Sequence, residues 1–272
     1  MQKSIANGSY NSKLSILFCI VLLEYLLFIF SGVSFTFLHG DTFFKIEADP
    51  VSWFFYCLKI PQFITSHHWF GITLDIAVIL LLLLFIRDPV NNRLAILLFL
   101  LLLLYYVTFM GYHAHRNYQF GFFMVFIPFL FKNETSKTYA YEATRYFLLF
   151  FYVSAALLKL SNQALTDISL FSHLISGQFT PYFLEGNTGI RTDVNLYLIG
   201  HPSLSHILYL ASFLIELSAI IGFFTKRLDK LLAIVLLLFH FCNWFIMDIA
   251  PFGQIAFICL LFLGNELKLK TK

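Results

Sequence analysis

Three ionisable side chains stand inside long apolar runs of this chain, where a charge is costly. Lys159 lies in the segment YVSAALLKLSN, Glu216 lies near the middle of one apolar run, and His240 lies near the middle of the next run. A charged side chain at the centre of a bilayer costs about 2.5–3.5 kcal/mol on insertion scales. Such groups are therefore expected to face other helices and to have either a partner or a function.

Lys159 is the best candidate for a catalytic base. Its helical neighbours Ala155 and Ala156 are small, and Tyr152 lies seven residues earlier on the same helix face. A lysine that loses its water in such a place gives up its proton more easily and could act as a base near neutral pH. The alternative is a lysine that extends its ammonium group to the lipid headgroups.

His240 and Asn243 are three residues apart in FHFCNWFIMD, so they share a helix face, and Trp244 follows one turn after His240. An imidazole, an amide and an indole together could line a pocket for a small aromatic or quinone-like ligand. A packing motif would have the same pattern, for instance with His240 paired to Glu216 on the neighbouring helix. We therefore treat His240 as a candidate catalytic residue, and Asn243, Glu216 and Tyr152 as candidate ligand-binding residues.

Metal and thiol chemistry find less support in the spacing of the residues. The nine histidines form neither the H-x3-H nor the H-x2-HH pattern of membrane di-iron oxygenases, so no metal site is predicted. The four cysteines include no C-x-x-C pair, which argues against a thiol–disulfide relay.

The composition indicates the elements that must position these groups. The chain of 272 residues is 59% hydrophobic and 12% charged, against about 25% charged residues in ordinary soluble domains. This predicts an all-α integral membrane protein, a single transmembrane domain over residues 1–272 with the lipid bilayer around it and no soluble domain. Eight apolar runs are candidate transmembrane helices of one bundle: residues 14–38, 70–86, 94–110, 120–131, 146–160, 203–224, 231–247 and 253–264.

The basic residues predict the orientation of these spans. With both termini cytoplasmic, thirteen lysines and arginines fall on the inner side and four on the outer side, as the positive-inside rule requires. Eight of the nine histidines then lie on or near the outer side, so any pocket is expected to open outward. We expect a multi-pass protein of a bacterial inner (plasma) membrane. No basic run with interleaved aromatics lies outside the apolar segments, so nucleic acid is not an expected partner.

Two outer connections are long enough to hold structure of their own. The connection His39–Trp69 contains the amphipathic segment SWFFYCLKIPQFI, which is typical of a helix lying along the interface. The connection Asn162–Gly200 begins with ALTDISLFSHLISG, which is apolar enough for a helix that is re-entrant or packed against the bundle.

Three segments carry a resemblance to a known family. IELSAIIGFFTKRLDKLLAIVLLLFHFCNWFIMDIAPFGQIAF, YVSAALLKLSN and HAHRNYQFGFF resemble parts of HTTM domains, the membrane part of vitamin K-dependent gamma-carboxylases. The resemblance is most specific over residues 145–264. It implies that Lys159 matches the lysine thought to start quinol oxidation. It also implies that His115 and Asn117 lie near the quinol.

The resemblance implies a membrane quinol as cofactor and a stand-alone bacterial HTTM protein. The carboxylases carry a large luminal domain after the bundle, which is not expected here, and Leu165 and Ile168 stand roughly where the family has Trp and Gly. Three functions therefore stay open. The first is a carboxylase-like, quinol-dependent enzyme. The second is a non-catalytic membrane partner for maturation or export of a secreted peptide, or for a neighbouring membrane protein. The third is a proton-coupled transporter that uses Glu24, Asp75 and Glu216.

Overall fold

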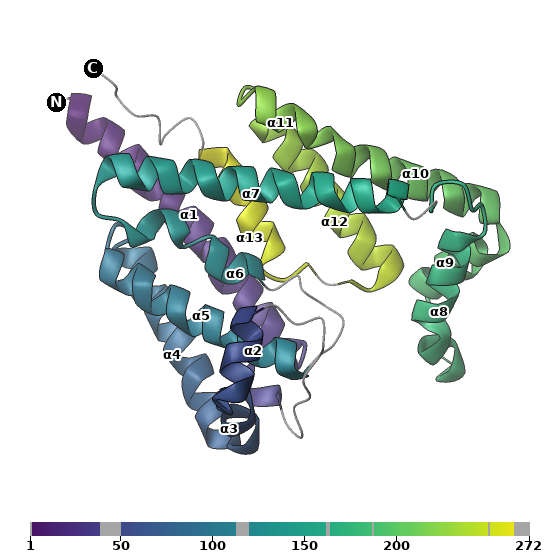
Figure 1. The fold of residues 1–272 in the computed structure, drawn as a ribbon, viewed down its shortest axis with the longest axis horizontal. Coiled ribbons are helices and arrows are strands. Elements are labelled where there is room, and N and C mark those ends of the chain that lie inside the picture. Colours follow the sequence, from purple (N-terminus) through teal and green to yellow (C-terminus); the bar gives the residue numbers. More distant parts are fainter. Residues whose placement is uncertain are drawn as a thin grey trace. The chain divides into compact units, whose positions relative to one another are not determined.

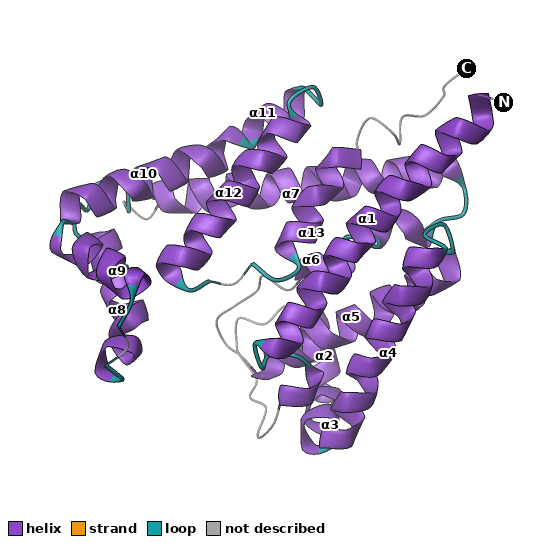
Figure 2. Cartoon of the chain, turned by 180° about the vertical axis from the view of Figure 1, so that it is seen from behind, coloured by secondary structure: helices purple, strands orange, loops and turns teal. Residues whose placement is uncertain are grey.

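The protein is helical throughout the part of the chain that the structure describes. A computed structural model describes residues 2–38, 50–112, 120–161, 164–186, 188–249 and 251–263. These residues form helices joined by turns, and none of them forms a strand (Figure 1; Figure 2). The predicted all-α class is therefore confirmed.

Six helical segments in the described part are long and apolar enough to cross a membrane. The chain therefore has the helices of a multi-pass membrane protein. The six segments are Ser12–Phe37, His68–Arg87, Asn92–Phe109, Glu134–Ser161, Pro202–Phe224 and Asp229–Met247.

The fold divides into two compact units, which we describe one at a time. Unit 1 comprises residues Met1–Thr144 and Phe252–Lys272, and unit 2 comprises Arg145–Pro251. The single domain expected from the sequence remains a prediction, since nothing in the structure tests it.

Unit 1 is built on the long helices α1, α4 and α5. Helix α4 packs against both α1 and α5, and the short helices α6 and α13 pack against each other (Figure 2). The predicted interfacial segment forms α2 and α3, while residues 39–49 of that connection lie outside the described residues. The elements of unit 1 are α1 (Gln2–Phe30), η1 (Phe35–Phe37), α2 (Pro50–Cys57), α3 (Ile60–Ser66), α4 (His68–Arg87), α5 (Asn92–Tyr112), α6 (Gly121–Met124), η3 (Ile127–Leu130), α13 (Gln254–Cys259) and η4 (Leu260–Leu263).

The interior of unit 1 is largely aromatic. The buried ring of Phe18 on α1 contacts Phe85, Phe126 and Phe129 at centroid separations of 4.6, 5.3 and 5.2 Å. Such edge-to-face and stacked pairs add about 0.5–1.5 kcal/mol each beyond the burial of their area. Part of the chain's high phenylalanine content thus serves to pack α1 against α4 and η3.

The two shortest predicted spans are the ones that the structure does not confirm as full crossings. Residues 120–131 form α6 and η3 in place of one continuous helix, and residues 253–263 form α13 and η4. Pro128 near the start of η3 cannot donate a backbone hydrogen bond, which favours a change of helix type there. The predicted count of eight transmembrane helices is therefore unconfirmed. The described residues contain six candidate spans.

A pair of glycines lets α6 approach the start of α13. A Cβ atom added to Gly121 would lie 2.2 Å from the carbonyl oxygen of Gly253, which no real side chain tolerates. Gly253 itself has a φ of +77°, a conformation that glycine adopts without steric cost. The two chain segments are therefore in backbone contact, and a larger residue at either position would push them apart.

Unit 2 consists of the second part of α7 and five further helices. Helix α10 packs against α8, α9 and α12. Helix α7 begins in unit 1 and continues into unit 2. The elements are α7 (Glu134–Ser161), α8 (Leu170–Leu184), α9 (Ile190–Gly200), α10 (Pro202–Ser218), α11 (Ile220–Phe224) and α12 (Asp229–Met247).

The described residues of the predicted connection Asn162–Gly200 include the hairpin of α8 and α9, so the helix expected near its start is present. Before α8, Asp167 accepts hydrogen bonds from the backbone N–H and the hydroxyl of Ser169, which hold the pKa of its carboxyl below the usual value. Ile175 and Phe179 of α8 pack with Leu198 of α9 in a small buried cluster. The hairpin therefore has an apolar core that joins its two helices.

Helix α7 is longer than its apolar part. The sequence predicts a span over 146–160, whereas the helix begins at Glu134. The carbonyl oxygen of the Asn133 side chain accepts the backbone N–H of Thr135 at 2.8 Å, and asparagine is a preferred residue at a helix start. A capped polar stretch therefore extends the apolar span, a feature that hydrophobic periodicity alone does not detect.

Candidate functional site

Helix α7 presents three polar side chains at intervals of seven residues. Arg145, Tyr152 and Lys159 lie on one face of the helix, because seven residues make almost two full turns. Successive members are about 10.5 Å apart along the axis, from a rise of 1.5 Å per residue. Each of the three has a polar partner in another helix of unit 2, so the partners form three levels.

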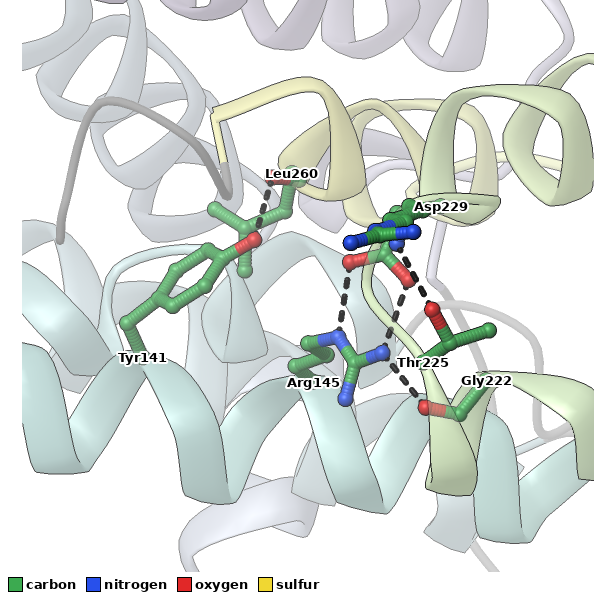
Figure 3. A network of polar contacts seen from close by, with 7 residues as sticks. Tyr141, Arg145, Gly222, Thr225, Asp229 and Leu260 are labelled. Atoms are coloured by element: carbon green, nitrogen blue, oxygen red, sulfur yellow. Dashed lines mark hydrogen bonds and ion pairs between the residues drawn. The ribbon is translucent and has the colours of Figure 1, made fainter.

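The first level is a buried ion pair between Arg145 and Asp229, the first residue of α12. Arg145 Nε lies 2.8 Å from one carboxylate oxygen of Asp229, and Nη2 lies 2.7 Å from the other (Figure 3). Nη2 also donates to the carbonyl oxygen of Gly222 in α11 at 2.6 Å. Both charged side chains are almost fully buried. The bidentate pair therefore ties α7 to the turn between α11 and α12.

The second level joins Tyr152 to His240 of α12. The tyrosine hydroxyl lies 2.6 Å from His240 Nε2, and both residues are buried. The two rings also make an edge-to-face contact at 5.8 Å between centroids. The hydroxyl can donate to a neutral imidazole or accept from its N–H, so the pair can pass a proton in either direction.

The third level joins Lys159 to α10. Its Nζ lies 2.8 Å from Glu216 Oε2, 3.1 Å from the hydroxyl of Ser212, and 5.1 Å from the centre of the Tyr209 ring. About one-fifth of the Lys159 side chain is exposed, whereas Glu216 is buried. The lysine thus turns toward the neighbouring helix rather than extending away from it. A carboxylate at this distance can take the proton of the ammonium group and return it.

Glu216 stands at an interruption of its helix. Helix α10 ends at Ser218, and α11 begins at Ile220 after a single turn residue, Ala219, whose N–H donates to the carbonyl oxygen of Glu216 at 3.2 Å. A Cβ atom on Gly222 would lie 2.6 Å from a methyl group of Leu149, so α11 packs closely on α7. Local changes of helix type of this kind often accompany functional groups.

The helix that carries His240 is held at both ends by arginines. Arg145 binds Asp229 at its start. At its end, Arg191 donates to the carbonyl oxygens of Trp244 and Phe245 and pairs with Asp248 at 2.8 Å. The last carbonyls of a helix have no partner within it and carry partial negative charge, which a guanidinium group satisfies. These contacts fix His240 along the helix axis.

The structure thus brings the predicted site residues together in two pairs. Lys159 lies against Glu216, and Tyr152 lies against His240. The pairing suggested between Glu216 and His240 is wrong, because each of the two has another partner on α7. Asn243 is half-buried, and its amide has no hydrogen-bond partner among the described residues.

The remaining predicted residues are not placed in this site. His115 and Asn117 lie outside the described residues. Across the ranges that the structure describes, no group of three or more histidine, cysteine, aspartate or glutamate residues is close enough to hold a metal ion.

Two of the three acids proposed for a transport path, Glu24 and Asp75, belong to unit 1, and both have fixed partners. Glu24 accepts the backbone N–H groups of Gly253 at 3.1 Å and of Ala256 at 2.8 Å, at the start of α13. Asp75 accepts four hydrogen bonds, one from Tyr25, one from Ser34 and two from Thr36, at 2.6 to 2.9 Å. Both acids thus join helices.

Sequence reasoning missed Arg145, Asp229 and Ser212. By the charge count alone, Arg145 is one of thirteen basic residues on the predicted inner side, and the sequence pattern assigns no role to Asp229. The spacing of seven residues between Arg145, Tyr152 and Lys159 is the signal that could have found the first. Ser212 lies four residues before Glu216, and so on the same helix face.

Comparisons of the chain with protein-family models, with curated proteins and with solved structures find no match. The resemblance to HTTM domains therefore remains a prediction, and function has to be argued from the geometry of unit 2.

Proposed function

We propose that the chain is a multi-pass membrane protein that carries out acid–base chemistry on a membrane quinol, with Lys159 as the base. The observation that supports this most directly is the contact of 2.8 Å between Lys159 Nζ and Glu216 Oε2. The ammonium group passes a proton to the carboxylate. The resulting amine would then accept a hydroxyl proton from a bound quinol, and the quinol would supply the two electrons of the reaction to dissolved oxygen as the acceptor.

Other groups of unit 2 suit the remaining needs of such a ligand. About one-fifth of the Lys159 side chain is exposed, and the ring of Tyr209 lies 5.1 Å from its Nζ atom. Among the described residues, the amide of Asn243 has no hydrogen-bond partner, so it is able to donate to a quinol oxygen or accept from a quinol hydroxyl. The pair of Tyr152 and His240 supplies a second place where a proton can be held.

The test is quinol binding and turnover by the protein in lipid nanodiscs. Menaquinol and vitamin K hydroquinone serve as probes with dissolved oxygen as the electron acceptor, and their oxidation is followed by absorbance. We expect Lys159→Met to lower the oxidation rate by about 100-fold or more, the usual contribution of a general base. Lys132→Met removes an exposed lysine of unit 1 and should leave the rate unchanged. A wild-type protein that neither binds nor oxidises quinol would overturn the proposal.

A quinol that binds wild type and the Lys159→Met variant equally well, without turnover, would instead favour the non-catalytic role as a membrane partner of a secreted peptide. The ion pairs of unit 2 would then serve only to pack its helices.

We further propose that the chain crosses a bacterial plasma membrane eight times, with both termini cytoplasmic and the site of unit 2 toward the outside. The excess of basic residues in the inner connections supports this orientation. Single cysteines at Lys59 and Arg227, in a background without the four native cysteines, test it in intact cells. A membrane-impermeant maleimide should label position 59 and not position 227, and the reverse result would contradict the orientation.

A further inference from the structure

The turn between α11 and α12 presents an unusual excess of positive charge. The side chains of Lys226, Arg227 and Lys230 are exposed, while Asp229, which stands among them in the sequence, is only 3% exposed. In the sequence, this turn contains three basic residues and one acidic residue, Asp229. In the folded protein, the acid points away from the surface that the three cations occupy.

Arg145 is the reason for this separation. It binds both carboxylate oxygens of Asp229, at 2.7 and 2.8 Å, and the carbonyl oxygen of Gly222 (Figure 3). The charge of Asp229 is therefore compensated by a buried guanidinium group. The hydroxyl of Thr225 is also engaged, because it accepts the backbone N–H of Arg227 at 3.2 Å. The turn thus has a fixed shape with its basic side chains turned outward.

Large apolar side chains flank these cations on the same turn. Phe224 is 84% exposed and Leu231 is 56% exposed, and both lie at ends of helices that are apolar enough to span a membrane. Exposed apolar groups next to exposed basic groups are typical of the boundary between the hydrocarbon core and the headgroups. In a membrane, this arrangement would place the cations at the depth of the lipid phosphates.

We propose that the turn between α11 and α12 binds the phosphate group of an anionic phospholipid. Arg227 offers a planar fork of donors to the phosphate oxygens, Lys230 adds a point charge, and Phe224 and Leu231 contact the acyl chains. Basic residues at a membrane surface each contribute about 1 kcal/mol to binding of anionic lipid. This site is separate from the quinol chemistry proposed above and does not depend on it.

Another turn of the protein provides a matched comparison. The turn between α4 and α5 in unit 1 carries the exposed residues Arg87 and Arg93, but its acid, Asp88, is exposed as well. The amide of Asn91 donates to Asp88 at 3.1 Å, and no guanidinium group of the described residues binds this acid. Its two cations are thus offset by an anion on the same surface, and we expect weaker binding of anionic lipid there.

The experiment measures lipid binding to the purified protein in detergent micelles by native mass spectrometry. Phosphatidylglycerol is titrated against phosphatidylcholine, and a separate arm adds inorganic phosphate as a competitor. We expect selective binding of phosphatidylglycerol, reduced roughly tenfold or more in the double variant Arg227→Gln/Lys230→Gln. The matched double variant Arg87→Gln/Arg93→Gln should retain binding within about twofold. Both double variants should unfold at the wild-type temperature, because all four side chains are exposed.

Three results would overturn the proposal. The first is equal binding of the two lipids by wild type. The second is an equal loss of binding in the two double variants, which would indicate attraction by net charge alone. The third is displacement of the lipid by inorganic phosphate at the same concentration, which would show that the turn binds phosphate without need of the lipid.

Discussion

The two units solve the problem of buried charge in different ways. In unit 1, the carboxylates of Glu24 and Asp75 are held by backbone N–H groups and hydroxyls, which are neutral donors. In unit 2, the acids Asp229 and Glu216 are held by arginine or lysine. A buried carboxylate is thus bound by uncharged hydrogen-bond donors in unit 1 and by a side chain of opposite charge in unit 2.

This difference separates packing from chemistry. Neutral donors fix the position of a carboxylate, but a backbone amide does not transfer its proton to the carboxylate. A lysine can release a proton to its acid, and the Lys159–Glu216 pair is more exposed than the pair of Arg145 and Asp229. The contrast also shows that a buried charge in a membrane helix is not by itself a functional site, since the acids of unit 1 have structural partners.

The largest effect is expected from removing the most completely bonded acid. Asp75→Leu leaves the donors of Tyr25, Ser34 and Thr36 without an acceptor inside unit 1. At about 1–3 kcal/mol for each buried unsatisfied group, we expect a loss of about 5 kcal/mol or more in the free energy of unfolding. Unfolding in mixed detergent micelles, followed by circular dichroism, measures it. A loss below about 2 kcal/mol would mean that these hydrogen bonds do not stabilise the unit.

Neutralising an acid should distinguish the two units. Asp229→Asn leaves the charge of Arg145 buried without its anion, and we expect a loss of about 3 kcal/mol in the free energy of unfolding. Asp75→Asn should cost less than about 1.5 kcal/mol, because the amide oxygen can still accept, and the amide N–H can donate to the hydroxyl of Tyr25. The same micelle experiment compares both variants. Equal losses of unfolding free energy in the two variants would show that uncharged donors and an ion pair do not differ in this respect.

The sequence was sufficient for the class of fold and for the long helices, because apolar runs of about 20 residues have few alternatives in a membrane protein. It was not sufficient for the short segments around Gly121 and Gly253. Their structure depends on a backbone contact between residues far apart in the chain. It also could not show that Asn133 starts α7 well before the apolar run, because hydropathy does not report a capped polar stretch.

Of the candidate site, the sequence predicted the members but not the pairs. The cost of burying a charge singled out Lys159, Glu216 and His240. The sequence does not show which helix each of these side chains faces, because that depends on how the helices are rotated about their axes. Arg145 was missed because a basic residue at the inner end of a span is ordinary, and only its partner on α12 makes it special.

A moderate effect is expected from Glu24→Gln. The Glu24 carboxylate accepts the backbone N–H groups of Gly253 and Ala256. In the glutamine variant, the side-chain NH2 group would lie against one of these N–H groups, so that two donors would face each other. Unlike the hydroxyl beside Asp75, a backbone N–H cannot reverse its role. We expect a loss of about 2 kcal/mol in the free energy of unfolding, and faster hydrogen exchange of the amides at Gly253 and Ala256. Unchanged exchange would show that Glu24 does not hold the start of α13.

The smallest effect is expected for the pair of Lys159 and Glu216, measured as a double-mutant cycle with Lys159→Met and Glu216→Gln. Since about one-fifth of the lysine is exposed, solvent screens the pair, and we expect a coupling of about 1 kcal/mol in the free energy of unfolding. The corresponding cycle with Arg145→Met and Asp229→Leu should give a coupling of about 3 kcal/mol. A weakly coupled lysine can separate from its acid during a proton transfer, whereas the arginine pair is suited to staying closed. A coupling as large as that of the arginine pair would therefore argue for a packing role of Lys159 and against its action as a base.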